Sequence, residues 1–150
     1  MIHIPPALTH RRFRYLWFGL LISMAGSQMQ LWAIFWHIRT LTDQPIALGG
    51  VGLARILPVI IFSLIGGAIA DTLNRRRIML ITQTGLALLA LALAWLTLEG
   101  QINLIWIYAI TALQAVAAAF DLPARQALVP SLVPVRDLPN AFSLNSIAAH

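Results

Sequence analysis

Cysteine and lysine are both absent from this 150-residue chain, and only five of its residues are acidic. Without cysteine, the chain can form neither a disulfide framework nor a thiolate metal site. Charged residues make up 10% of the composition and hydrophobic residues 59%, whereas soluble domains are about a quarter charged and about half apolar. Together with a mean hydropathy of +0.81, these values exclude an ordinary soluble domain and predict a protein that lies in a lipid bilayer.

Motifs of soluble enzymes are also missing. The segment Gly50–Arg55 begins like a dinucleotide-binding loop, but it lacks the third glycine and a preceding strand. The sequence has no phosphate-binding Walker loop, no Gly-x-Ser-x-Gly turn and no His-Glu-x-x-His motif, and its four histidines lack metal-ligand spacing. We therefore expect neither an enzyme nor a bound cofactor or metal.

All ten basic residues are arginines, and they give the chain a formal net charge of +5. A basic protein can bind nucleic acid, but that function needs a basic face on a soluble fold. Here the arginines lie mostly at the ends of apolar runs, which membrane topology explains. We therefore expect a lipid bilayer as the partner of this chain, and no nucleic acid.

Four long apolar runs are separated by short polar segments. They cover about residues 14–37, 47–70, 78–98 and 103–121, and a fifth run begins at residue 140. A helix of about 20 residues crosses a bilayer and satisfies its own backbone polar groups there. We therefore expect an all-α membrane protein with four complete transmembrane helices. The fifth run stops at His150, so we expect an incomplete N-terminal transmembrane domain of a longer protein.

Prolines interrupt the segment that follows the fourth run. The stretch from Leu122 to Pro139 contains four of them. Proline lacks the backbone N–H and clashes with the preceding helical turn. The pattern predicts short turns along the membrane surface instead of one continuous helix.

The arginines predict how the chain is oriented. Only Arg39 lies in a loop after an odd-numbered run, whereas eight lie on the other side, at Arg11, Arg12, Arg14, Arg75, Arg76, Arg77, Arg125 and Arg136. Basic loops are retained in the cytoplasm. Four of the five tryptophans gather near the opposite boundary, as expected for an interfacial belt, at Trp32, Trp36, Trp95 and Trp106. We therefore expect a multi-pass protein with a cytoplasmic N-terminus.

Three polar residues lie inside the apolar runs, at Gln30, Arg55 and Gln114. Polar and charged groups in hydrocarbon are costly and usually face a cavity or a partner helix. Hydrogen bonding between packed helices is the alternative for the glutamines, and snorkelling toward the headgroups is the alternative for Arg55. We regard the three as candidates for lining a substrate pathway.

A charged loop separates the second run from the third. It follows the pattern Gly-x-x-x-Asp-x-x-x-Arg-Arg-Arg, with Gly67, Asp71, Arg75, Arg76 and Arg77. In spacing and position it resembles the signature loop between the second and third helices of major facilitator superfamily transporters. Thr72 replaces a residue that is usually basic in that family, and Asn74 replaces a usual glycine. Asparagine tolerates the left-handed backbone conformation that we expect at this turn.

A second block strengthens the resemblance. The segments 121–130 and 138–141 resemble bacterial drug and siderophore exporters related to the enterobactin exporter. The resemblance implies the N-terminal part of a twelve-helix inner-membrane transporter, whose two six-helix halves rock around a central site. It also implies that Asp71, Arg75 and Asp121 form a charge cluster that helps to lock the outward-facing state.

One departure concerns proton coupling. Many drug/proton antiporters carry an arginine on helix four, three residues before a glutamine–glycine pair, whereas this chain has Thr111 and Gln114-Ala115 there. The resemblance implies a secondary active transporter that exports small amphipathic molecules by alternating access, with protons as the expected coupling ion. An uptake symporter of the same superfamily and a stand-alone membrane-embedded interaction subunit remain as alternatives.

Overall fold

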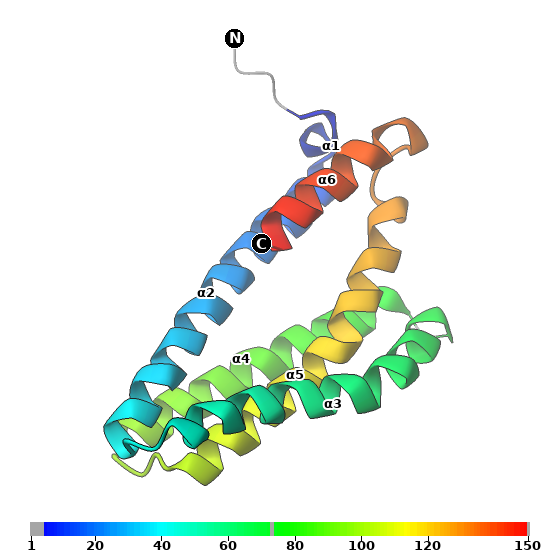
Figure 1. Ribbon diagram of the computed structural model, residues 1–150. Coiled ribbons are helices and arrows are strands. Elements are labelled where there is room, and N and C mark those ends of the chain that lie inside the picture. The colour runs from blue at the N-terminus through cyan, green and yellow to red at the C-terminus, as the bar shows by residue number, and fades with distance from the viewer. Residues whose placement is uncertain (1–4, 73, 150) are drawn as a thin grey trace. The chain divides into compact units, whose positions relative to one another are not determined.

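The computed structural model describes the backbone of residues 5–72 and 74–149, and their side chains except at 64–72 and 147–149. These residues contain helices and no strand (Figure 1). The elements are α1 (Pro6–Thr9), α2 (Arg11–Leu41), α3 (Pro45–Thr72), α4 (Arg75–Leu98), α5 (Leu104–Leu128), the 3-10 turns η1 (Val129–Ser131) and η2 (Val135–Asp137), and α6 (Leu138–Ala149). The prediction of an all-α protein is confirmed.

Helices α2, α3, α4 and α5 are long and apolar enough to cross a membrane. α4 has 24 residues, which at a rise of about 1.5 Å per residue exceeds the roughly 30 Å of the hydrocarbon core. Much of the apolar surface of these helices is exposed; Ile22, Ile81 and Ile105, for example, are more than 70% exposed. Such surface is unfavourable in water and is expected where a helix faces lipid. The prediction of four membrane-spanning helices is confirmed.

Helix α5 continues past the predicted end of the fourth run. Pro123 lies inside α5, which runs to Leu128 before η1 begins. The prediction of short turns from Leu122 onward is therefore wrong for residues 122–128. A proline removes only one backbone hydrogen bond, and here Asp121 and Ala124 on either side of it are buried and pack the helix in place. Beyond Leu128 the expected short turns are present as η1 and η2.

Asn74 begins helix α4. Its backbone is extended, with φ −65° and ψ 106°, and its side-chain Oδ1 accepts hydrogen bonds from the amides of Arg76 (3.1 Å) and Arg77 (3.4 Å). The left-handed conformation expected at this residue is therefore wrong. An N-cap residue needs an extended backbone so that its side chain can reach the unpaired amides of the first turn.

Removal of this cap gives a first testable prediction. Asn74→Ala is expected to lower the free energy of unfolding by about 0.5–2 kcal/mol, because the amide of Arg76 loses its side-chain acceptor, whereas that of Arg77 keeps its bond to the carbonyl of residue 74. Asn74→Ser keeps a capping oxygen and should stay close to the wild type. Unfolding of the purified chain in detergent, followed by circular dichroism, measures both variants. Equal losses for alanine and serine would contradict the capping role.

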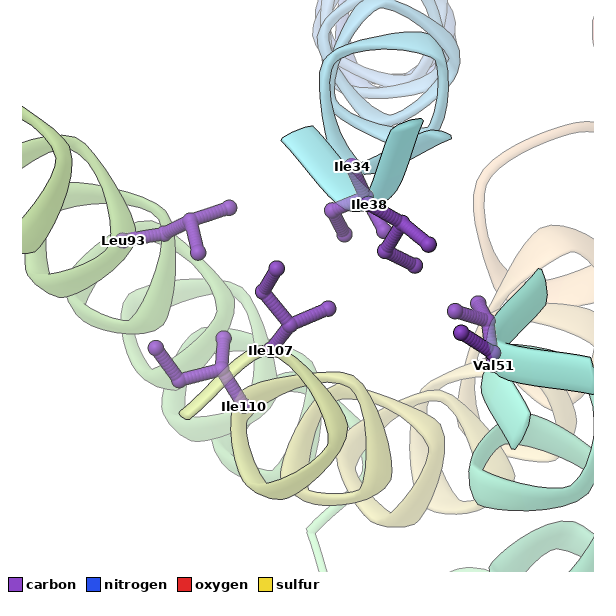
Figure 2. Close-up of a cluster of buried hydrophobic side chains, with 7 residues drawn as sticks. Ile34, Ile38, Val51, Leu93, Ile107 and Ile110 are labelled. Atoms are coloured by element: carbon purple, nitrogen blue, oxygen red, sulfur yellow. The ribbon is translucent and has the colours of Figure 1, made fainter. Parts of the chain in front are cut away.

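The chain divides into two packed units, and each is described by itself. One unit comprises Leu31–Arg125. Its core lies near the loops that join α2 to α3 and α4 to α5, and Figure 2 shows side chains from all four helices pointing toward one another there. The buried residues of this core are Ile34, Ile38, Ala47, Val51, Leu93, Ile107 and Ile110. Their spacing of three or four residues within α2, α3 and α5 places them on one face of each helix.

A tyrosine joins α3 to α5 in this unit. The hydroxyl of Tyr108 donates a hydrogen bond to the carbonyl of Ala47 at 2.9 Å. The ring lies directly against Gly50, where a Cβ atom would stand 2.7 Å from the hydroxyl oxygen and 2.8 Å from Cζ. Only glycine leaves room for the ring at this position.

The other unit comprises residues 1–30 and 126–150. Its core contains Ala7, Phe13, Val129, Val133 and Ala141. Polar contacts join α1 and the start of α2 to the segment around α6. His10 Nε2 lies 2.8 Å from Asp137 Oδ2. The amide of Ala7 donates to Asn140 Oδ1, and the indole of Trp17 donates to the carbonyl of Leu144. The segment 7–17 is thereby packed onto the beginning of the fifth apolar run.

Candidate functional site

A buried carboxylate lies between α4 and α5. Asp121 is 4% exposed. Its Oδ1 accepts hydrogen bonds from Thr82 Oγ1 at 2.8 Å and from Gln83 Nε2 at 3.1 Å, and its Oδ2 pairs with Nη2 of Arg125. A buried charge is tolerated only when it is paired and hydrogen-bonded, and both conditions are met here. We call Thr82, Gln83, Asp121 and Arg125 the Asp121 cluster.

Local helix geometry produces this cluster. Asp121 and Arg125 are one turn apart on α5, a spacing that brings opposite charges together. Thr82 is buried on α4, and Gln83 follows it directly. Small side chains permit a neighbouring helix to approach closely, and α5 buries Ala115 and Ala119 in the turns that precede Asp121.

The chemistry of the cluster is that of a clamp between two helices. It contains one negative and one positive charge and two neutral groups that donate hydrogen bonds. Separation of α4 from α5 would remove two donors from the carboxylate, although its bond to Arg125 lies within α5. Breaking such buried contacts is costly, so the cluster favours the arrangement in which it is intact.

The signature loop is only partly described. Gly67 and Asp71 lie outside the residues whose side chains the structure describes. Arg75, Arg76 and Arg77 form the first turn of α4 and are exposed. The charge cluster of Asp71, Arg75 and Asp121 therefore stays a prediction.

Sequence reasoning did not find the described partners of Asp121. The spacing of Asp121 and Arg125 was a usable signal, because residues four apart on a helix are neighbours. No sequence signal pointed to Thr82 and Gln83, since their contact with Asp121 depends on how α4 is rotated against α5.

The three candidates for a pathway lie in different environments. Gln30 and Gln114 are half-buried, and Arg55 on α3 is exposed. The Nε2 atom of Gln30 and the Oγ1 atom of Thr111 are buried with no hydrogen-bond partner among the described residues. Unsatisfied buried polar atoms are rare and need a ligand, a water or a further partner. The role of Gln30, Arg55 and Gln114 in a pathway stays a prediction.

Metal binding has no candidate in the part of the chain that the structure describes. No group of three or more histidine, aspartate or glutamate side chains is arranged there to hold a metal ion. Ion pairs in this part join Asp121 to Arg125 and Asp137 to His10 and Arg136.

Comparison with known proteins identifies the family. A family model described as transmembrane secretion effector matches residues 5–150. The staphyloferrin A transporter of Staphylococcus aureus (strain NCTC 8325 / PS 47) is 28% identical over 136 residues, which are 89% of this chain and 34% of that protein. The chain thus spans about a third of the length of this curated relative. No solved structure matches the present chain. With a family match over nearly its whole length and four helices long enough to cross a bilayer, the chain belongs to the transmembrane secretion effector family of major facilitator transporters.

Proposed function

We propose that the protein containing this chain is a secondary active transporter that exports small amphipathic molecules, driven by the proton gradient. The observation that carries the proposal is the match of residues 5–150 to transmembrane secretion effectors. The similarity to a staphyloferrin A transporter supports a small-molecule substrate and a transporter instead of an enzyme. Such transporters rock two transmembrane halves around a central site, and this chain would supply most of one half.

The proposed orientation places the N-terminus and the α3–α4 loop in the cytoplasm of a bacterial cell. Arginines support it, because they form the first turns of α2 and α4. In the unit Leu31–Arg125, the tryptophans lie toward the C-terminal ends of α2 and α4 and the N-terminal end of α5. The α2–α3 and α4–α5 loops at these ends would face the outside. These tryptophans are 49–72% exposed, as an interfacial belt requires, at Trp32, Trp36, Trp95 and Trp106.

The proposed gate contains the Asp121 cluster together with Asp71 and Arg75. Alternating access requires contacts that form in one state and break in the other. The clamp between α4 and α5 joins two helices of one half, so in this gate it would hold Asp121 in place while contacts with the other half form and break. Gln30, Arg55 and Gln114 would line the pathway. Thr111 stands where related antiporters carry their coupling arginine, so protons would be coupled through another group.

Transport in inverted membrane vesicles tests this function. The complete reading frame that contains residues 1–150 is expressed, and the vesicle lumen is acidified. An exporter is expected to accumulate a small amphipathic fluorophore or staphyloferrin A, and a protonophore should abolish the accumulation. The 150-residue chain alone should not transport, because its spans cannot enclose an alternating-access pathway.

Other outcomes distinguish the alternatives. Proton-dependent accumulation only in right-side-out vesicles would indicate an uptake symporter and refute export. A 150-residue product that transports nothing but copurifies with one stoichiometric membrane partner would indicate an interaction subunit. Transport of the substrates without any response to a protonophore would refute proton coupling and leave export intact.

A further inference from the structure

An open groove lies on the surface of α4, in the unit Leu31–Arg125. It has a volume of about 450 Å³ and is lined by Leu80, Ile81, Thr84, Gly85 and Leu88. Gly85 adds no side chain to this surface, and a Cβ atom built there would lie in open space, with no other atom within 4 Å. The groove is almost entirely apolar, and the side chain of Ile81 at its edge is 72% exposed.

The groove faces away from the rest of its unit. The buried residues of α4 are Ile78, Thr82 and Leu93. At 100° per residue they lie about one third of a turn from the centre of the groove. A groove on this side of a transmembrane helix faces lipid or another membrane-embedded chain.

An arginine lies on the same face of α4 as the groove, and this face, from Arg77 to Leu88, is called the stripe below. Arg77 precedes Ile81, Thr84 and Leu88 by four, seven and eleven residues, and these spacings keep all four on one helix face. The side chain of Arg77 is exposed, and exposed Arg76 precedes it. The backbone amides of both residues already donate to Asn74, so an anion at this end would be held by the guanidinium groups.

The length of the stripe corresponds to one leaflet of a bilayer. Arg77 and Leu88 are separated by about 16 Å along the helix axis. Half of the hydrocarbon core measures about 15 Å. An arginine at the headgroup level therefore has a continuous apolar groove below it that reaches the bilayer midplane.

We propose that Arg77, Arg76 and the groove over Gly85 form a binding site for one anionic phospholipid. The guanidinium groups bind the phosphate through charge-assisted hydrogen bonds, and one acyl chain fills the groove. Charge complementarity selects this occupant. An apolar helix would fill the groove but bring no anion to Arg77, and a free phosphate would leave the groove empty. The site is independent of substrate and of the direction of transport.

Native mass spectrometry of the full chain tests the site. The probes are phosphatidylglycerol and phosphatidylcholine with identical acyl chains. The wild type is expected to retain one phosphatidylglycerol preferentially. Arg77→Gln should lower that occupancy about tenfold, as expected for loss of a hydrogen-bonded charge contact, and should remove the preference over phosphatidylcholine. Gly85→Leu adds an apolar side chain at a position where a Cβ atom has open space, and it should weaken both lipids equally.

Matched controls separate this site from general lipid coating. Gly52→Leu adds the same side chain at an open glycine of α3, and Arg39→Gln removes an exposed arginine in the last turn of α2. Both should leave lipid retention unchanged, and circular dichroism should show all four variants folded. Equal retention of the two lipids by the wild type would overturn the proposal. So would equal effects of Arg77→Gln and Arg39→Gln, competition by the deacylated headgroup alone, or a dimer that Gly85→Leu dissociates.

Discussion

Asp121→Ala is expected to lower the free energy of unfolding by about 3–5 kcal/mol, because it leaves the Arg125 guanidinium buried without its carboxylate. The side chains of Arg125 and Asp121 are only 13% and 5% exposed, so little water reaches the contact that is lost. The substitution also removes an acceptor of Thr82 and Gln83, although the Thr82 hydroxyl can still donate to the carbonyl of Met79. Stability in detergent, measured by denaturant titration and circular dichroism, gives the size of the effect.

A double variant shows whether this loss arises from the unpaired charge. Replacement of both Asp121 and Arg125 by leucine removes the pair as a whole, and such replacements are often neutral or stabilising. Most of the stability lost in Asp121→Ala should therefore return. Arg136→Gln is the surface control, since Arg136 is 83% exposed and 3.9 Å from Asp137, and it should change stability by less than about 1 kcal/mol. Equal losses in the single and double variants would rule out an unpaired charge as the cause.

Gly50→Ala is expected to be the next most damaging change. Its Cβ atom would stand 2.7 Å from the hydroxyl of Tyr108, so the ring or the two helices must move. Such overpacking costs about 1–3 kcal/mol, and the hydrogen bond from Tyr108 to Ala47 would be lost in addition. The same denaturant titration in detergent measures the change.

Gly52→Ala is the matched control for that variant. It lies two residues further along α3, and its Cβ atom meets nothing within 4 Å. It should be neutral or stabilise the helix by up to about 1 kcal/mol. Gly50→Ala should also cost little when Tyr108 is already alanine, since the clash has then been removed. Similar losses from both glycine substitutions would show that the ring of Tyr108 does not constrain position 50.

Composition and length were sufficient to predict the helices. The apolar run at residues 78–98 lies within α4, because a segment of that length and hydropathy can pair its backbone N–H and C=O groups in lipid only as a helix. Local rules were less successful at the boundaries. Pro123 did not end α5, since burial of the neighbouring residues outweighed the one lost hydrogen bond. Asn74 proved to be an N-cap, although a turn residue with the left-handed conformation was expected.

The candidate site depended on contacts between segments that are distant in the sequence. Asp121 was identified by resemblance, but its donors Thr82 and Gln83 lie 39 and 38 residues away. The pair of His10 and Asp137 spans 127 residues. Helical periodicity shows which face of a helix is apolar, but it does not show which helix packs against that face. Such pairs could not be derived from one sequence.

Transport by an Asp121→Asn and Arg125→Gln double variant tests the proposed gate most directly. The complete transporter is assayed in inverted vesicles beside Asp43→Asn, which changes an exposed acid in the loop between α2 and α3. The double variant keeps neutral hydrogen-bonding groups and no unpaired charge, so it should fold. We predict that it loses most of its proton-driven export, whereas Asp43→Asn transports like the wild type. Normal export by the folded double variant would show that the Asp121 cluster holds α4 and α5 together without gating transport.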